Sequence, residues 1–551
     1  NNLLDNVVVR YAGGYGSYGS VYIATSSMTV ENSTITQGNG HGIRLQASTG
    51  DGTIRIIDND ITGHAARGIF VNYSNGDFDI DIEDNTIFDN GQEGIYIGNS
   101  TVRIFDIFNN SITENGYDGI SVNKSTATGV SGDFAFINID NNTIADNGYY
   151  GIEAISSTLS VTANEIFGHS APYDGIYLDG DTFLNSTVAP NSPSPNPPPP
   201  DNYIHDNDLN VIIIGGQLSQ SDTWSSGTYV VDRLTVNAGA TLTIQADTVV
   251  KFVQNGYMTI NGTLVADGTA GAIYFTSLLD DTVGAGDGDT NNDDDATLPE
   301  AGDWYRLDFG PGSVDNLLDN VVVRYAGGGG NGAVRIRSAV PNQPTIVRNS
   351  DIINNSSYGI FLNAAVAAVI DYNLIENNSS WGIWAYNYTT AAITHNTILN
   401  NGAYGISIEY NSSANIEENT ISGHSSYGIY VSGSPATTAI RNNTITTTGN
   451  YGIYALNSTL SINDNTISGH TTEGAIFVDG TTLLNSRSAI SDNIITGNQI
   501  VVGGTLNQSD TWSGTYVVDR LTVNAGATLT IQADTVVKFV QNGYMTINGT
   551  L

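Results

Sequence analysis

The sequence predicts an all-β protein whose strands stack into a coiled solenoid, and three observations lead to this prediction. Short runs of Val, Ile, Thr and Tyr alternate with Asn and Gly turns throughout the 551 residues, and long helix-forming stretches are missing. One phrase, N-x-x-I followed by G-I, recurs along the chain. Apolar residues alternate within each repeat, as in "GISVNK" and "GISIEY", which indicates strands with one buried face.

The short repeat sets the size of one coil. A fixed period indicates one supersecondary unit per repeat. Each unit holds about three short strands and no helix, so equivalent strands can pair in parallel only if the chain coils. We therefore expect three short strands per coil of about 23–26 residues. In the second half of the chain the Gly of the Gly-Ile pair falls, at spacings of 23 or 24, at Gly359, Gly382, Gly405, Gly428 and Gly452.

This repeat resembles the right-handed parallel β-helix of pectate-lyase-like proteins, and also tandem-repeat extracellular surface and adhesin fibres. The resemblance covers nearly the whole chain and is carried by "NNSITENGYDGISV" (109–122), "NNTIADNGYYGIEA" (141–154) and "HNTILNNGAYGISI" (395–408). It implies a right-handed parallel β-helix in which the repeated Asn residues stack and their side-chain amides bond from coil to coil. It implies little about function, because this solenoid hosts lyases, hydrolases, epimerases, adhesins and inert fibres. The stacking Asn residues would be Asn59, Asn85, Asn110, Asn142, Asn164, Asn373, Asn396, Asn419, Asn443 and Asn465.

A much longer repeat overlies the short one. Residues 221–264 and 509–551 differ by one deleted serine, and "NLLDNVVVRYAGG" at 2–14 recurs at 316–328. We expect copy one at 1–220, starting within a module, copy two at 221–508, and the start of a third, truncated copy at 509–551. All three are expected to be solenoid coils of a tandem array that continues past Leu551. Proline cannot donate to a β ladder, so "NSPSPNPPPP" (191–200) is expected to leave its coil as a loop.

Composition excludes some partners and sites. The net charge of −38, from 55 acidic and 17 basic residues, argues against nucleic acid, which needs a basic face. The absence of cysteine excludes disulfides and thiolate metal sites. No run of about 18 apolar residues suggests a membrane span. We expect an extracellular or cell-surface protein, and its many N-x-S/T sequons, such as those at Asn72 and Asn123, would make it a glycoprotein where they face outward.

The Asp-rich loop at 280–303 is the candidate metal site. Oxygen-bearing side chains recur there at every second residue, and calcium takes six to eight hard oxygen ligands. The sixth and twelfth positions are Asn292 and Leu298, not the Gly and Glu of an EF-hand, so that motif is excluded. The segment is therefore either a calcium site or a solvated acidic loop. The candidate ligands are Asp287, Asp289, Asn291, Asp293 and Asp295.

Two other groups of polar residues favour structural roles. "DFDIDIED" places its acids along one strand face, not across neighbouring coils, with no base nearby in sequence, which favours a solvated face. The histidines of the I-x-G-H phrase exchange with Asn in other coils, so they are expected to be turn residues, since catalysis needs one unique constellation. These groups are Asp77, Asp79, Asp81 and Glu83, and His64, His169, His424 and His470.

Aromatic residues recur beside the Gly-Ile pairs and would form ladders of stacked rings in a solenoid. These rings either stiffen the solenoid and form contacts between rods, or they form a sugar-binding platform. We favour the first interpretation. They precede the Gly at Tyr150, Tyr358, Trp381, Tyr404, Tyr427 and Tyr451, and follow the Ile at Phe70, Tyr96, Tyr177, Phe361, Trp384, Tyr430 and Tyr454.

Near-identical duplication without a unique catalytic cluster favours a structural protein, because repeating a module lengthens a rod. We expect a stiff acidic solenoid that self-associates, end to end or laterally, into a surface fibre, sheath or adhesin stalk, and that is not an enzyme. The alternative is a secreted polysaccharide-binding or polysaccharide-degrading protein of the lyase or hydrolase type. Beside self-association, cell-surface or matrix polysaccharide is the other partner class that we consider.

Overall fold

The computed structural model describes residues 2–14, 18–47, 50–127, 136–169, 175–190, 201–207, 210–284, 288–291, 296–446, 448–470, 474–496 and 499–551. These residues form two compact units. Unit 1 comprises Asn1–Ser219, Val230–Thr235 and Asp289–Ala296, and unit 2 comprises Gln220–Tyr229, Val236–Gly288 and Thr297–Leu551. The predicted sequence copies, with boundaries at 220 and 508, divide the chain at other places than these two units. Those boundaries therefore stay a prediction.

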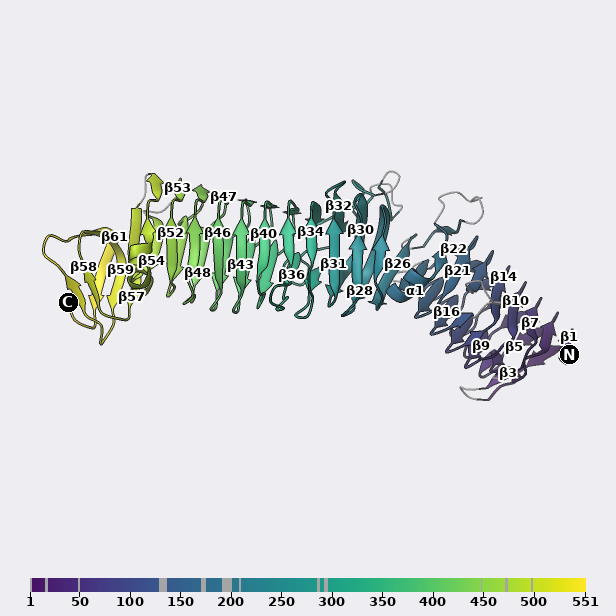
Figure 1. The fold of residues 1–551 in the computed structure, drawn as a ribbon. Helices are drawn as coiled ribbons and strands as arrows, with labels where there is room; N and C mark the ends of the chain where they lie inside the picture. Colours follow the sequence, from purple (N-terminus) through teal and green to yellow (C-terminus); the bar gives the residue numbers. More distant parts are fainter. Residues whose placement is uncertain are drawn as a thin grey trace. The chain divides into compact units, whose positions relative to one another are not determined.

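Unit 1 is built from three ladders of parallel strands, one strand of each ladder per coil (Figure 1). The first ladder runs from β1 (Asn2–Asp5) to β24 (Thr187–Val188), and the second runs from β2 (Val8–Arg10) to β25 (Tyr203–His205). The third ladder contains β3 (Gly19–Ile23), β6 (His41–Leu45), β9 (Ile69–Asn72), β12 (Ile95–Gly98), β16 (Ile120–Asn123), β20 (Ile152–Ile155), β23 (Ile176–Asp179) and β26 (Ile212–Leu218).

Unit 2 repeats this arrangement. Its first ladder runs from β27 (Asp222–Trp224) to β55 (Ile490–Ser491), and its second from β32 (Ile273–Ser277) to β56 (Ile494–Thr496). The duplicated segment after residue 508 continues the coiling, because β57 (Gln499–Leu506), β59 (Thr515–Val523) and β61 (Val536–Ile547) pair in parallel. The third ladder before it contains β30 (Thr248–Ile260), β33 (Arg306–Phe309), β36 (Val334–Ile336), β39 (Ile360–Asn363), β42 (Ile383–Tyr386), β45 (Tyr404–Glu409), β48 (Tyr427–Ser432), β51 (Ile453–Leu456) and β54 (Gly474–Asp479).

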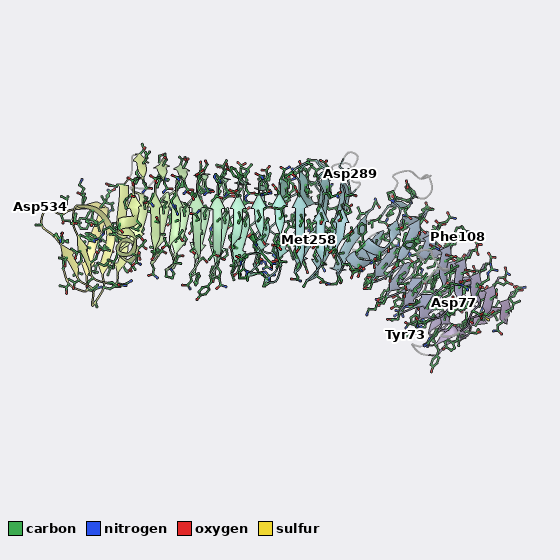
Figure 2. All side chains as sticks on the ribbon, viewed as in Figure 1. Tyr73, Asp77, Phe108, Met258, Asp289 and Asp534 are labelled. Atoms are coloured by element: carbon green, nitrogen blue, oxygen red, sulfur yellow. The ribbon has the colours of Figure 1, made fainter. Side chains whose placement is uncertain are left out.

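The predicted all-β solenoid is confirmed, with about 21 turns in all. Apolar side chains fill the interior of each coil, because the sequence alternates and every second side chain of a strand points inward. Stacked isoleucines, such as Ile95 and Ile120 in adjacent strands, are fully buried. Outward side chains are exposed, as for Phe108 and Tyr73, whereas Met258 is buried; all three are labelled in Figure 2.

The predicted Asn ladder is also confirmed. Asn110 is buried, and its amide donates to Asn142 Oδ1 in the next coil at 3.0 Å and to the carbonyl of Ile82 at 2.9 Å. The left-handed backbone conformation falls on the preceding residue, Asn109, with φ of 58°, and not on the stacking Asn itself. The ladder therefore satisfies buried backbone groups at a turn where the chain changes direction.

Two short helices, α1 (Gly180–Asn185) and α2 (Gly480–Ser486), follow the third ladder in corresponding places of the two sequence copies. Asp179 and Asp479 cap them by accepting from the backbone N–H of Thr182 and Thr482. No helix in the described ranges is long and apolar enough to cross a membrane.

Candidate functional site

The outward face of the third ladder in unit 1 carries the most distinctive set of side chains. Because neighbouring strands pair in register, one outward position per coil forms a column along this face: Phe70, Tyr96, Ser121, Glu153 and Tyr177. A second column precedes the Gly of each coil and contains Arg67, Glu93, Asp118 and Tyr150.

A cleft of about 450 Å³ opens where the two columns carry carboxylates instead of aromatic rings. All of its lining residues belong to unit 1. They are Tyr117, Asp118, Tyr149, Tyr150, Glu153, Ile155, Tyr177 and Asp232.

Asp118 is the most perturbed acid of the cleft. It is only 8% exposed, and its Oδ1 accepts from the backbone N–H of Tyr150 at 3.0 Å. Burial raises the pKa of Asp118 to about 8, and the nearby charge of Glu153 adds to this effect. The Asp118 carboxyl is therefore protonated near neutral pH and is able to donate a proton.

Glu153 lies one coil further along, half-buried, on the neighbouring column. The Ser121 hydroxyl donates to its Oε2 at 3.2 Å. Burial raises the pKa of Glu153, while the hydrogen bond from Ser121 works in the opposite direction by favouring the carboxylate. Two carboxyl groups in different environments, one of them protonated, form the arrangement that separates an acid from a base.

Tyrosines form the walls of the cleft. Tyr117 and Tyr149 pack edge to face at 5.1 Å, and Tyr150 and Tyr177 pack at 5.2 Å. Burial raises the pKa of Tyr177 to about 12, so its phenol is neutral. Apolar ring faces beside a few convergent polar groups are typical of a ligand site.

At the next coils along this face, Arg67 is paired with an acid and His41 is neutral. Arg67 forms an ion pair with Glu93 at 2.9 Å and lies over the ring of Tyr96 at 4.4 Å. His41 stacks on Phe70 at 4.3 Å, and burial lowers its pKa to about 4, so it is neutral at neutral pH.

The structure describes only part of the predicted calcium site. Asp287, Asp293 and Asp295 lie outside the described residues. Asp289 is half-buried and is labelled in Figure 2, and Asn291 is buried. Elsewhere in the same loop, Asp280 is fully buried and pairs with Arg324 at 2.7 Å, which is a structural role. Within the described ranges, no three His, Cys, Asp or Glu side chains gather as a metal site would require.

The expectation for Asp77, Asp79, Asp81 and Glu83 needs correction. The alternation is as expected, and Asp77 lies on the outside (Figure 2). However, parallel pairing in register places Asp106 beside Asp81 and Arg55 on its other side, so the acids do extend across neighbouring coils and meet a base. This could not be anticipated from one strand, because Asp106 and Arg55 are a full coil away in sequence.

The histidines of the I-x-G-H phrase are turn residues, as predicted. His64 is buried, its Nε2 lies 2.9 Å from the carbonyl oxygen of Ile35, and its backbone N–H donates to Asn90 Oδ1. His169 and His424 occupy equivalent buried places. None of the three faces the cleft residues described above.

Sequence reasoning missed Asp118 and Glu153. It noted Tyr150 and Tyr177 only as members of a ring ladder. The available signal was their position, because in "YDGI" and "GIEA" a carboxylate replaces the aromatic residue that most other coils carry beside Gly-Ile.

Comparison with known proteins identifies the fold family. The family model described as "Right handed beta helix region" matches residues 67–279 and 312–445, more than half of the chain. The chain belongs to the right-handed beta helix family. The predicted handedness of this β-helix is thereby confirmed. No curated protein sequence matches the chain.

A second family model, described as "Periplasmic copper-binding protein (NosD)", matches residues 1–132 and 399–514 of this β-helix. Copper prefers imidazole and sulfur ligands. The chain has seven His, three Met and no Cys, and in the described ranges no metal-ligating cluster of His, Asp or Glu forms. The described residues therefore do not fit a copper centre.

Similar solved structures include two A-modules of mannuronan C-5 epimerases from Azotobacter vinelandii and a periplasmic alginate epimerase. The A-modules are 14% and 15% identical, with TM-scores of 0.36 and 0.35, and each comparison covers 60% of this chain and 90% or 91% of the module. The periplasmic enzyme is 11% identical with a TM-score of 0.24, covering 84% of this chain and 77% of its own. At these values the likeness concerns the fold.

The expectation that this β-helix is not an enzyme is contradicted by the similar solved structures, which are epimerases by their titles. The error came from treating duplication as evidence of a purely mechanical role. A solenoid repeats its interior, while single outward positions, such as Asp118, are free to differ.

Proposed function

We propose that this β-helix binds a polysaccharide on the outward face of unit 1 and cleaves it hydrolytically in the tyrosine-lined cleft. The observation that carries this proposal is the protonated Asp118 beside Glu153, within an open cleft on a parallel β-helix. The proposal takes up the polysaccharide alternative, while the fibre, sheath and adhesin roles gain no support from the comparisons.

The geometry suits an extended sugar chain. The strands of the third ladder lie side by side, so the outward columns run across many coils and present a continuous surface. Tyr150 and Tyr177 offer ring faces on which the apolar face of a sugar can pack. Ser121 and Glu153 supply polar atoms for sugar hydroxyls.

The proposed reaction uses two proton transfers. The Asp118 carboxyl donates its proton to the glycosidic oxygen as the bond from that oxygen to the anomeric carbon breaks. The Glu153 carboxylate takes a proton from a water molecule, whose oxygen forms the new bond to the anomeric carbon. One water is consumed, two sugar ends are released, and the proton on Glu153 returns to Asp118 through solvent.

The test is hydrolysis of a panel of neutral and acidic polysaccharides, measured as new reducing ends. We expect Asp118→Asn and Glu153→Gln each to lower kcat by about 100-fold or more, with the fold retained by circular dichroism. Asp106→Asn, on the first ladder, is the matched control and should leave kcat unchanged. Wild-type protein that releases no ends from any polymer, or variants that remain active, would overturn the proposal.

We also propose that the chain works outside the cytoplasm, in the periplasm or beyond. Support comes from the match to a family whose name is periplasmic. Fusion to a reporter that is active only after export would test this, and cytoplasmic activity alone would contradict it.

Calcium binding in the Asp-rich loop stays a proposal. The candidate ligands are those given above, from Asp287 to Asp295. Isothermal titration with calcium should show uptake at millimolar concentration or below, and Asp289→Asn should weaken it by about tenfold. Absence of heat at millimolar calcium would remove the proposal.

A further inference from the structure

Three arginines converge on one carboxylate in unit 2. Asp308 of β33 is buried, and its oxygens accept from Arg335 Nε at 2.9 Å and from Arg337 Nη2 at 2.9 Å. Arg306 comes from the same strand as Asp308, and its guanidinium lies over the ring of Tyr305 at 5.6 Å. One carboxylate cannot balance three guanidinium groups, so this cluster carries excess positive charge on a chain with a net charge of −38.

Arg306 is the least satisfied member of the cluster. Its Nη1 is shielded from solvent and donates no hydrogen bond. Burial lowers the pKa of Arg306, and the charge of Arg335 is the next contribution. Arg306 as a whole is only half-buried, so the rest of its guanidinium can meet an anion from outside, and the neighbouring charges of Arg335 and Arg337 favour one. A purely structural ion pair with Asp308 would need neither the second nor the third arginine.

The cluster stands at the start of a column of aromatic rings. Pairing in register aligns Asp308 with Arg335, Arg335 with Phe361, and Phe361 with Trp384. Phe361 and Trp384 stack at 4.5 Å, and the Nε1 of Trp384 is a second shielded donor without a hydrogen bond. Aromatic positions resume on the same column with Tyr430, Tyr454 and Phe477.

A second column of rings runs parallel to the first. Trp381 stacks on Tyr404 at 5.1 Å, Tyr404 on Tyr427 at 5.2 Å, and Tyr427 packs across to Tyr454 at 4.6 Å. Most of these rings are half-buried, so their outer surfaces remain open to a ligand. Unit 2 thus combines a long aromatic face with a cationic end.

We propose that this face of unit 2 is a second binding site, which holds an acidic polysaccharide with a sugar carboxylate on Arg306 and the following sugar rings on the aromatic columns. A planar guanidinium matches a planar carboxylate through two parallel hydrogen bonds. The inference rests on the proposed function only for the chemical class of the ligand. It requires neither the cleft nor catalysis.

Isothermal titration of the full chain with a hexamer of galacturonic acid tests the site, with a neutral galactose hexamer and a sulfated galactose hexamer as comparison ligands. We expect the uronate to bind at least tenfold more tightly than the neutral hexamer, and Arg306→Gln to remove this preference. Arg55→Gln, with the same change of charge in unit 1, should leave it intact. Equal binding of the uronate and the neutral hexamer would overturn the proposal, and so would an equal loss of uronate binding in Arg306→Gln and Arg55→Gln. Tighter binding of the sulfated hexamer than of the uronate would overturn the choice of a carboxylate as the ligand group.

Two further variants keep the proposal testable if Arg306→Gln does not fold, and separate it from the proposed function. Trp384→Phe keeps one aromatic ring in the stack but removes the Nε1 donor and the second ring of the indole, so it should weaken uronate binding severalfold even if Arg306→Gln does not fold; unchanged binding would count against the site. Asp118→Asn should lower kcat by about 100-fold or more and leave uronate binding to unit 2 unchanged. If hydrolysis fails while Arg306-dependent binding is intact, only the proposed function is refuted. If hydrolysis occurs without Arg306-dependent binding, only this inference is refuted.

Discussion

At the scale of single residues, the stacked amides carry much of the specificity of the turn. Asn419 shows how completely one side chain is used. Its Nδ2 donates to the carbonyls of Ile393 and Glu417 and to Asn443 Oδ1, and its Oδ1 accepts from Asn396. Each amide therefore ties its own turn to the coils on both sides.

Asn419→Ala should destabilise its coil by about 1–3 kcal/mol, because it leaves buried carbonyls and the Asn396 amide unpaired. Hydrogen exchange of the surrounding backbone amides measures this local opening. Asn415→Ala, on the outward face of the same coil, is the control, since Asn415 bonds only Glu417 through its side chain. Equal protection in both variants would refute the role of the ladder.

His424 makes another turn of the same coil, the one between β47 (Thr420–Ser422) and β48, dependent on pH. Burial lowers its pKa from 6.5 to about 4. Between these values the unfolded chain binds a proton that the folded chain does not, so stability is lost as the pH falls from 6.5 towards 4. The loss amounts to about 3 kcal/mol at the lower limit.

His424→Asn should remove this part of the acid sensitivity, because Asn401 shows that an amide can occupy the neighbouring turn and donate to a carbonyl. Urea unfolding at pH 7 and pH 4.5 measures the difference. An unchanged loss of stability in the variant would mean that other groups cause it.

At the scale of elements, strands and helix caps were predictable to different degrees. The alternation in "GISIEY" correctly indicated β45, because inward positions must be apolar in any coil. The short helix α2 was not anticipated, since "GTTLLNS" is short and lacks strong helix formers. Its N-cap, Asp479, becomes visible only once the end of β54 is known.

Asp479 accepts from the N–H of Thr482 at 2.8 Å and from the N–H of Asn457 in the preceding coil at 3.1 Å. Asp479→Ala should therefore destabilise α2 by about 1–2 kcal/mol. Asp479→Asn should be nearly neutral, because Asn is an equally good cap. Thermal unfolding followed by circular dichroism compares the two, and equal losses would contradict the capping role.

The candidate site marks the limit of sequence reasoning for a physical reason. Asp118 and Glu153 are separated by more than one coil in sequence, and their properties depend on burial and on each other's charge. The register that brings them to one cleft is set by isoleucines on the opposite face of the strands. Sequence periodicity therefore located the columns but not the chemistry on them.

At the scale of the whole molecule, the main feature is the net negative charge. A net charge of −38 produces repulsion throughout the chain, and salt screens it. We expect the unfolding temperature to rise by several degrees when sodium chloride is raised from about 10 mM to about 500 mM. Differential scanning calorimetry measures this shift, with sucrose at equal osmolality as a control. A falling unfolding temperature would show that favourable ion pairs outweigh the repulsion.

The parallel register of the ladders also constrains how such a gene can change in length. Removal of one residue from a strand would turn its isoleucines outward, and removal of one or two would break the amide stack, so small deletions there should be eliminated by selection. Gain or loss of an entire turn preserves every contact except those at the two junctions. Unequal recombination between near-identical segments, such as 221–264 and 509–551, offers a route to such changes, and related genes should differ by multiples of a full turn.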